Sequence, residues 1–256
     1  MPFQKIETEK LSQSVVRQIE RLILQGVLRP GERLPAEREL SERMGVSRPS
    51  LRDAVAALES AGLLVTRAGS GIYVAEVLGS AFSPALIRLF ASHEDAVADY
   101  ISFRRDLEGL AAERAARLGS DTDLAVIDSL FQRMLAAHVK RDASAEARLD
   151  AEFHMAIIEA SHNVIMLHMM RSMVDLLRAG LFYNRQAMFR QKQTRDLLLD
   201  QHRAIRDALL ARDPAGARNA IEAHLDHVQT TLTDLARADR HEAVARLRFA
   251  QESERG

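Results

Sequence analysis

Four side chains of metal-ligand type lie in the second half of the sequence, on three segments with helical patterns. Asp150 and His154 are four residues apart in "LDAEFHMAIIEA", a spacing that places both on one face of a helix. His202 follows in "DQHRAIRDALL" and His224 in "EAHLDHV". One carboxylate and three imidazoles suit a divalent transition metal, with zinc as the first candidate and nickel, manganese or iron as alternatives. The sequence has nine histidines, however, and a single histidine on a helix is more often an ordinary core or surface residue.

Two arginines lie one helical turn apart near the start of a short predicted helix in the first half of the sequence. Arg48 and Arg52, in "GVSRPSLRD", share a helix face. A guanidinium makes bidentate contacts with guanine or phosphate, and a helix N-terminus itself favours phosphate. We therefore expect this helix to contact DNA, with Arg38 and Ser47 as further phosphate contacts. The alternative is that both arginines are solvated side chains on an amphipathic helix.

The elements around these arginines follow from apolar spacing and glycine positions. Apolar residues at helical spacing predict a first helix over Leu11–Leu24. Gly45 ends a second helix, and Ser47 can cap a third over Arg48–Ser60. The runs "LLVTR" and "IYVA" flank a glycine-rich tip containing Gly69, which is typical of a β-hairpin. Three helices followed by a hairpin predict a winged helix-turn-helix, whose third helix enters the major groove while Gly69 lets the backbone approach the minor groove.

Beyond residue 84 the sequence has helical segments and almost no strand pattern. Short breaks between long helices favour an antiparallel bundle. The expected helices cover Asp95–Leu118, Asp121–Lys140, Ala143–Ala160, Val164–Tyr183, Met188–Ala211 and Ala215–Ala236. The predicted fold class is therefore mainly α, with an N-terminal winged helix-turn-helix and a C-terminal all-α antiparallel helical bundle.

Composition along the chain sets the expected domain limits. Residues 1–75 form the winged helix-turn-helix domain, and residues 76–84, which mix small residues with glycine and proline, form a linker. Residues 85–237 form the bundle. Residues 238–256 are charged and weakly amphipathic, so they form either a loose tail or an extension of the last helix.

The overall composition excludes several classes of protein. The 256 residues contain no cysteine, which excludes a disulfide framework, a thiolate zinc site and a cysteine nucleophile. The first residues, "MPFQKIETEK", are polar and do not resemble a signal peptide, and no long apolar run predicts a membrane span, so we expect a cytoplasmic protein. Because the formal net charge is only −1, binding to DNA has to come from the local placement of arginines.

The first part of the chain resembles a known family. The stretch "LRPGERLPAERELSERMGVSRPSLRDAVAALESAGLL", followed by "GSGIYV", is similar to the N-terminal domain of GntR-family bacterial transcription regulators. The resemblance implies that Arg38, Arg48 and Arg52 contact operator DNA, assisted by Ser47 and Gly69.

The second part resembles the FCD ligand-binding domain found in the FadR subfamily of GntR regulators. The similarity lies in "FRRDLEGLAAERAA", "LDAEFHMAIIEASHN" and "QHRAIRDALLARDPAGARNAIEAHL". It implies that a divalent cation, which presents a small carboxylate effector, is bound by Asp150, His154, His202 and His224. It also implies an effector-binding arginine, here Arg104 with Arg105 as the alternative. Asn184 is a further candidate for the effector pocket.

Within the subfamily, the chain is most similar to members that respond to glycolate, lactate or pyruvate. We therefore expect a transcription regulator, classed as a repressor although activation stays open. As a homodimer it would bind a pseudo-palindromic operator with an affinity controlled by a 2-hydroxy or 2-oxo acid.

Other functions stay open at this point. One alternative is a regulator for which the metal itself is the signal, and another is a metal-free domain for a fatty-acyl effector. From another class, a metal-dependent hydrolase fused to a DNA-binding domain is possible, but no general base is evident beside the ligands. We expect no enzymatic activity.

Overall fold

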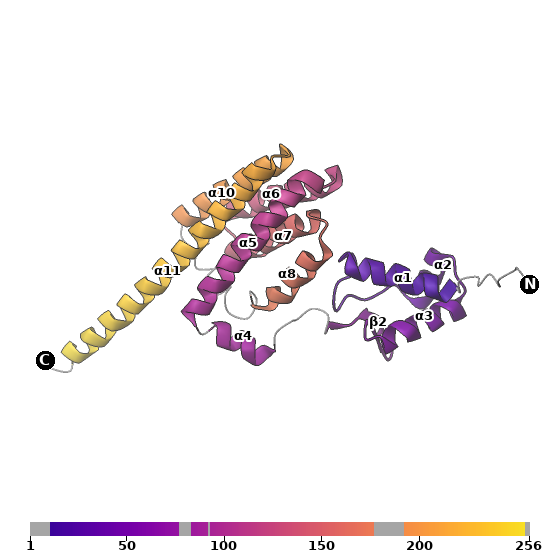
Figure 1. Ribbon diagram of the computed structural model, residues 1–256. Helices are drawn as coiled ribbons and strands as arrows, with labels where there is room; N and C mark the ends of the chain where they lie inside the picture. The colour runs from indigo at the N-terminus through magenta and orange to yellow at the C-terminus, as the bar shows by residue number, and fades with distance from the viewer. Residues whose placement is uncertain (1–10, 77–82, 92, 177–191, 254–256) are drawn as a thin grey trace, which may run out of the picture. The chain divides into compact units, whose positions relative to one another are not determined.

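The computed structural model describes residues 11–76, 83–91, 93–176 and 192–253 (Figure 1). The chain forms two compact units, one of residues 1–82 and 167–173 and the other of residues 83–166 and 174–256. Among the helices of the described residues, none is both long enough and apolar enough to cross a membrane.

Residues 11–76, in the first unit, form three helices and a two-stranded antiparallel sheet. These elements are α1 (Leu11–Leu24), α2 (Glu37–Met44), α3 (Arg48–Ser60), β1 (Leu64–Arg67) and β2 (Gly71–Val74). Helix α2 ends at Gly45, whose φ of 66° is the left-handed conformation that favours glycine. The Ser47 hydroxyl then caps α3 by accepting a hydrogen bond from the Ser50 N–H at 3.2 Å. The predicted winged helix-turn-helix is confirmed.

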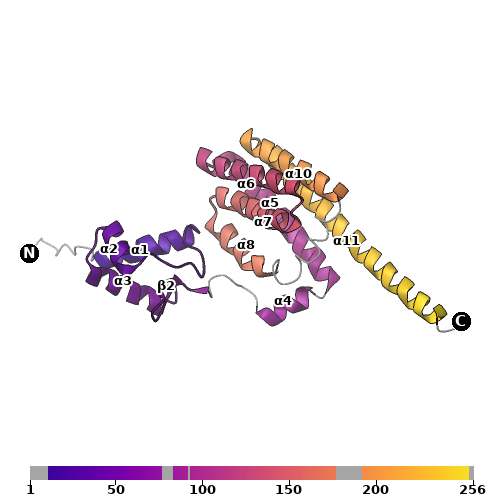
Figure 2. The ribbon, with the colours of Figure 1, turned by 180° about the vertical axis from the view of Figure 1, so that it is seen from behind.

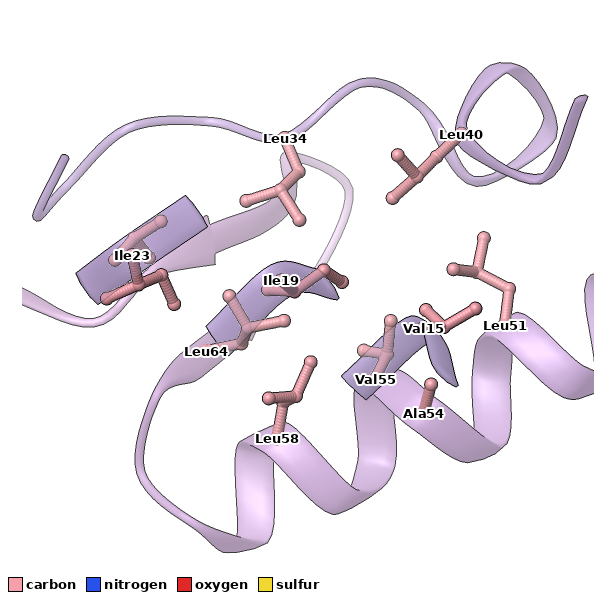
Figure 3. Close-up of a cluster of buried hydrophobic side chains, with 11 residues drawn as sticks. Val15, Ile19, Ile23, Leu34, Leu40, Leu51, Ala54, Val55, Leu58 and Leu64 are labelled. Atoms are coloured by element: carbon pink, nitrogen blue, oxygen red, sulfur yellow. The ribbon is translucent and has the colours of Figure 1, made fainter. Parts of the chain in front are cut away.

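An apolar core joins the helices and the sheet of the first unit (Figure 3). Its main side chains come from α1 and α3: Val15, Ile19, Ile23, Leu51, Ala54, Val55 and Leu58. Complete burial of a leucine such as Leu51 or Leu58 stabilises the fold by roughly 1.5–3 kcal/mol. Because this stripe occupies the inner face of α3, the charged residues of the helix lie on its outer face.

Every described element from residue 84 onward is a helix. These helices are α4 (Pro84–Ala91), α5 (Glu94–Leu118), α6 (Asp121–Lys140), α7 (Ala143–Ala160), α8 (Val164–Leu176), α10 (Lys192–Leu210) and α11 (Pro214–Ser253). Helix α5 packs against α7 and α11, while α10 packs against α6 and α11. The predicted all-α second part is therefore confirmed, and its interior lies where α5, α7, α10 and α11 meet.

One helix was not predicted, and another is longer than the segment predicted for it, in a region where the sequence left two alternatives open. Helix α4 was not predicted, although Ser83 and Pro84 carry a helix-start signal: the Ser83 hydroxyl accepts the Leu86 N–H at 3.3 Å. The last bundle helix was predicted over Ala215–Ala236, followed by either a loose tail or an extension of that helix. Helix α11 continues to Ser253, past the other helices of the bundle (Figure 2). Good helix formers and i,i+4 ion pairs support this exposed stretch, as between Glu242 and Arg246 at 2.8 Å.

The two predicted helices on either side of residue 184 extend beyond the described part of the chain. The structure describes α8 only as far as Leu176 and α10 only from Lys192. The predicted ends of these helices, Tyr183 and Met188, lie outside the described residues.

Candidate metal centre and nucleic-acid interface

Asp150, His154, His202 and His224 come together in the interior of the helical bundle. Helix α7 supplies the first two, α10 supplies His202 and α11 supplies His224. One potential ligand atom from each residue lies within 4.8 Å of the others, and no residue of the set is more than 4% exposed. The structure therefore brings together the four residues that the sequence proposed as ligands, which we call the Asp-His cluster.

Each imidazole of the Asp-His cluster has a partner at its Nδ1 atom. For His154, His202 and His224 in that order, the partners are Glu108 Oε2 at 2.5 Å, the Leu198 carbonyl oxygen at 2.7 Å and Gln201 Oε1 at 3.0 Å. An imidazole that donates from Nδ1 keeps an acceptor lone pair on Nε2, which is the form that binds metal ions. These partners thus fix the ring orientation that a metal site requires.

The buried Nε2 atoms fit a cation. Within the part of the chain that the structure describes, His154 Nε2 and His202 Nε2 are buried without a hydrogen-bond partner. Asp150 Oδ1 lies 3.1 Å from His202 Nε2 and 4.0 Å from His154 Nε2. A buried polar atom left unsatisfied costs about 1–3 kcal/mol, and one shared cation can remove that cost for several atoms. The donor types and their burial therefore fit a divalent transition metal.

Glu108 and Arg104 form a buried ion pair on α5 beside His154. Arg104 Nε lies 2.5 Å from Glu108 Oε1, and neither side chain is more than 4% exposed. Burial by itself would raise the pKa of Glu108, but the charge of Arg104 and the hydrogen bonds from Arg104 and His154 outweigh it and hold this pKa at about 2. Burial lowers the pKa of His154 and thereby favours its neutral form. Glu108 is thus an anion that orients a neutral imidazole.

Glu108 and Gln201 were not among the residues singled out in the sequence. The sequence shows no obvious general base beside the ligands, and the structure places one carboxylate, that of Glu108, against His154. Its carboxylate is already engaged by Arg104 and His154, which leaves it poorly suited to act as a general base. Its spacing of four residues from Arg104 indicates an ion pair between the two side chains. The sequence does not tell, however, which acidic residue of α5 faces α7.

Replacing Glu108 by Gln should weaken metal binding. The substitution removes the negative charge that holds His154 Nδ1, and loss of such a partner lowers metal affinity by roughly 10–100-fold. Competition with a chromogenic chelator measures this change. The variant also leaves Arg104 buried without its counter-charge, so thermal melting should show a lower midpoint.

Glu113→Gln, on the same helix but paired with Arg117 and Arg218, is the matched control and should keep the original metal affinity. Equal affinities for both variants would contradict the role assigned to Glu108.

The residues predicted to contact DNA lie on α2, at the N-terminal end of α3 and in the turn of the hairpin. The side chains of Arg38, Arg48 and Arg52 are 83%, 56% and 63% exposed. Ser47 holds the N-terminus of α3, as described above. Gly69, between β1 and β2, has a φ of 70°, and a Cβ atom there would meet nothing within 4 Å. The tip of the hairpin is therefore open to a close approach by another molecule.

A hollow of about 300 Å³ lies between the segment leading into α2 and the hairpin. Its charged lining residues are Arg33, Glu37 and Arg67. Arg67 stacks over the Tyr73 ring at 4.6 Å and pairs with Glu76 at 2.8 Å. Glu37 thus lines this hollow and also contacts Arg48 and Arg52 of α3.

The residues predicted to bind an effector differ in where the structure places them. Arg104 is buried, and its partner Glu108 is hydrogen-bonded to His154 of the Asp-His cluster. Arg105, the alternative, is one-third exposed and pairs with Asp226 at 2.7 Å. Arg104 therefore stays the candidate on α5, while Asn184 lies outside the described residues.

Two sequence families account for most of the chain. Residues 11–74 match the bacterial regulatory proteins of the gntR family, and residues 99–227 match the FCD domain. The chain belongs to the GntR family. The winged unit is thus its GntR domain, and the bundle that contains the Asp-His cluster is its FCD domain.

Individual relatives agree with this assignment. Over 240 residues the chain is 33% identical to the Glc operon transcriptional activator of Escherichia coli K12, covering 93% of this chain and 94% of the relative. It is 34% identical over 243 residues to the putative L-lactate dehydrogenase operon regulatory protein of the same strain, covering 93% of each. A solved structure, Streptococcus agalactiae GntR, matches with a TM-score of 0.55 and 25% identity over 86% of this chain and 99% of that chain. This GntR-family protein is accordingly a DNA-binding transcriptional regulator, and its family and relatives are regulators rather than enzymes.

Proposed function

We propose that this regulator binds operator DNA with an affinity controlled by a small carboxylate held at a divalent metal in the FCD domain. The observation that carries the proposal is the buried Asp-His cluster, whose donor atoms lie within 4.8 Å of one another. A bound cation would satisfy these buried donor atoms, because it accepts lone pairs from Asp150, His154, His202 and His224 together. Zinc is the first candidate, and nickel, manganese and iron stay open.

The proposed effector is a 2-hydroxy or 2-oxo acid. A bound divalent metal supplies a positive charge and open coordination positions, which such an acid can occupy through its carboxylate and the adjacent oxygen. One E. coli relative is named for an L-lactate dehydrogenase operon, and lactate is a 2-hydroxy acid, which favours small acids of this class. Arg104 adds a second cation near His154, and a guanidinium pairs well with a carboxylate. Asn184 is a further proposed contact.

The proposed DNA-binding surface consists of Arg38, Ser47, Arg48, Arg52 and Gly69. A homodimer in the cytoplasm would present two copies of this surface to the two halves of a pseudo-palindromic operator. The acid would change operator affinity if it binds the two dimer arrangements unequally, and a coupling of this kind changes affinity by roughly 5–150-fold. Whether the bound protein represses or activates depends on where the operator lies relative to the promoter.

Titration with candidate acids tests the effector proposal. Purified protein of measured metal content should bind one of glycolate, lactate, pyruvate or glyoxylate saturably, with heat release and a higher melting temperature. Removal of the metal by a chelator should abolish this binding, because the acid would then lack its anchor. Acetate, which has no oxygen next to the carboxyl group, is the matched control and should bind much more weakly.

Other outcomes of this titration favour different functions. Metal-loaded protein that binds none of the four acids, but whose affinity for DNA changes with metal, would favour a metal-sensing regulator. Turnover of simple esters that requires the metal would favour a hydrolase. Protein that takes up no metal would contradict the proposed role of the Asp-His cluster.

A further inference from the structure

Glu37 connects the two helices of the proposed DNA-binding surface. It is the first residue of α2, and its Oε1 atom lies 3.0 Å from Arg48 Nε and 2.9 Å from Arg52 Nε, both on α3. Its side chain is 27% exposed, whereas both arginines are more than half exposed. Hydrogen bonding by Arg52, followed by that of Arg48, holds the pKa of Glu37 below its ordinary value. The carboxylate is therefore ionised between the two guanidinium groups.

This contact differs from the other ion pairs of α2. Glu39 and Glu42 pair with Arg43 and Arg38 within α2, at the i,i+4 spacing that is common on exposed helices. Glu37 instead reaches a second helix and engages two arginines with one oxygen. Neither Arg48 nor Arg52 pairs with any other acidic residue among those that the structure describes.

The atoms involved matter for recognition. The closest contact of each arginine with Glu37 is through Nε, and bidentate recognition of guanine can use the two terminal Nη groups. A flexible arginine has to lose side-chain freedom before it can make such a contact, and the carboxylate removes part of that freedom in advance. Glu37 thus leaves donors available for a base while it restricts where they lie.

The same carboxylate disfavours contact with phosphate. Binding to DNA of any sequence depends on phosphate neutralisation by arginine and lysine. An anion between Arg48 and Arg52 cancels part of their charge and repels a nearby phosphate, so it lowers affinity for all sequences. Contacts with base edges carry the sequence information, and they are aided by the restricted guanidinium groups.

We infer that Glu37 is a specificity-determining residue, which directs Arg48 and Arg52 toward bases and away from phosphates. The inference rests on the proposed DNA-binding surface. Glu37 raises the ratio of operator affinity to non-specific affinity, rather than the operator affinity itself. It acts through the arginines, so it is a positioning residue even if it never touches DNA.

The test compares Glu37→Gln with the unaltered protein on two kinds of DNA. Selection from random-sequence duplexes with the unaltered protein first yields its preferred site. Affinities for that site and for a scrambled duplex are then measured over a series of salt concentrations. For Glu37→Gln, we expect scrambled-duplex affinity to rise several-fold with a salt slope steeper by roughly one unit per chain. Affinity for the selected site should not rise, so the ratio of the two affinities should fall about fivefold or more.

Two further variants separate charge from position. Glu39→Gln loses the same charge on the same helix, but its partner is Arg43, so the ratio of affinities should stay near that of the unaltered protein. Glu37→Asp keeps the charge but shortens the reach to Arg48 and Arg52. We expect it to leave scrambled-duplex affinity unchanged while affinity for the selected site falls. Thermal melting followed by circular dichroism verifies that all three variants fold.

The outcomes distinguish failure of this inference from failure of the proposed operator binding on which it rests. If Glu37→Gln changes the two affinities in parallel, as Glu39→Gln should, the carboxylate has no role in specificity and the inference is overturned. If the unaltered protein enriches no sequence at all, the proposed operator binding fails, and the inference fails with it.

Discussion

Replacing His202 by Ala should remove most of the bound metal and abolish the response to the acid effector. His202 is fully buried, its Nδ1 is held by the Leu198 carbonyl oxygen, and its Nε2 lies 3.1 Å from Asp150 Oδ1. Loss of this imidazole leaves three of the four proposed ligands. Since removal even of a residue that only supports a ligand costs roughly 10–100-fold in metal affinity, removal of the ligand itself should cost more. Elemental analysis of dialysed protein measures the metal content.

The same variant should keep its DNA binding. In the absence of the acid, its affinity for the selected site should stay within about twofold of the original, because the winged domain has its own apolar core. Addition of the acid should no longer change that affinity. Full metal occupancy in His202→Ala would exclude His202 as a ligand.

Two controls separate metal loss from damage to the bundle. His227→Ala removes an imidazole on α11 that contacts Thr231 and lies outside the Asp-His cluster, so metal content should be unchanged. Asp150→Asn keeps the size and shape of the carboxylate ligand but removes its charge. It should therefore lower the metal content without opening a cavity. If all three variants keep the circular dichroism spectrum of the unaltered protein yet only His227→Ala retains metal, the loss belongs to the site.

Helices of the bundle were predictable where the signals for their ends are local. The segments Asp121–Lys140 and Ala143–Ala160 were predicted with the bounds that the structure has, since polar caps precede them and short breaks separate them. Helix α4 was missed because Ser83 and Pro84 occur in a stretch of small residues that is typical of a linker. The extension of α11 stayed open in the sequence, because a charged, weakly amphipathic segment fits both a helix and a loose tail.

The side-chain contacts at the metal centre and at the DNA-binding surface were less predictable than the positions of the helices. The i,i+4 spacing places Asp150 beside His154, but it says nothing of the partners that approach from other helices. Glu108 reaches His154 across 46 positions of sequence, and Glu37 reaches Arg48 across 11. Both contacts depend on how two helices pack against each other, and the spacing of residues within one helix does not predict this packing. Family resemblance supplied the metal ligands, whereas the anions that orient ligands and arginines became visible only in the structure.

Replacing Arg48 or Arg52 by Ala should greatly weaken binding to the selected site. Each guanidinium that contacts a base contributes about 1–3 kcal/mol of discrimination, and a homodimer would lose the contact in both half-sites. The expected loss is therefore about 2–6 kcal/mol, or roughly 30-fold or more. Both side chains are more than half exposed and lie outside the buried stripe that contains Leu51 and Leu58, so the domain should stay folded by circular dichroism. Fluorescence anisotropy with a labelled duplex measures the affinity.

Lysine substitution separates base recognition from charge at these two positions. Arg52→Lys keeps the positive charge but loses the planar fork, so affinity for scrambled DNA should be nearly unchanged while the selected site loses most of its advantage. Arg43→Ala, an exposed arginine of α2 paired with Glu39, is the matched control and should bind the selected site within a fewfold of the original. Because Glu37 holds Arg48 and Arg52 together, the double Ala variant should cost less than the sum of the single variants. Strict additivity would contradict the coupling through Glu37. Selected-site affinity unchanged in both single variants would show that α3 does not read the operator through these arginines.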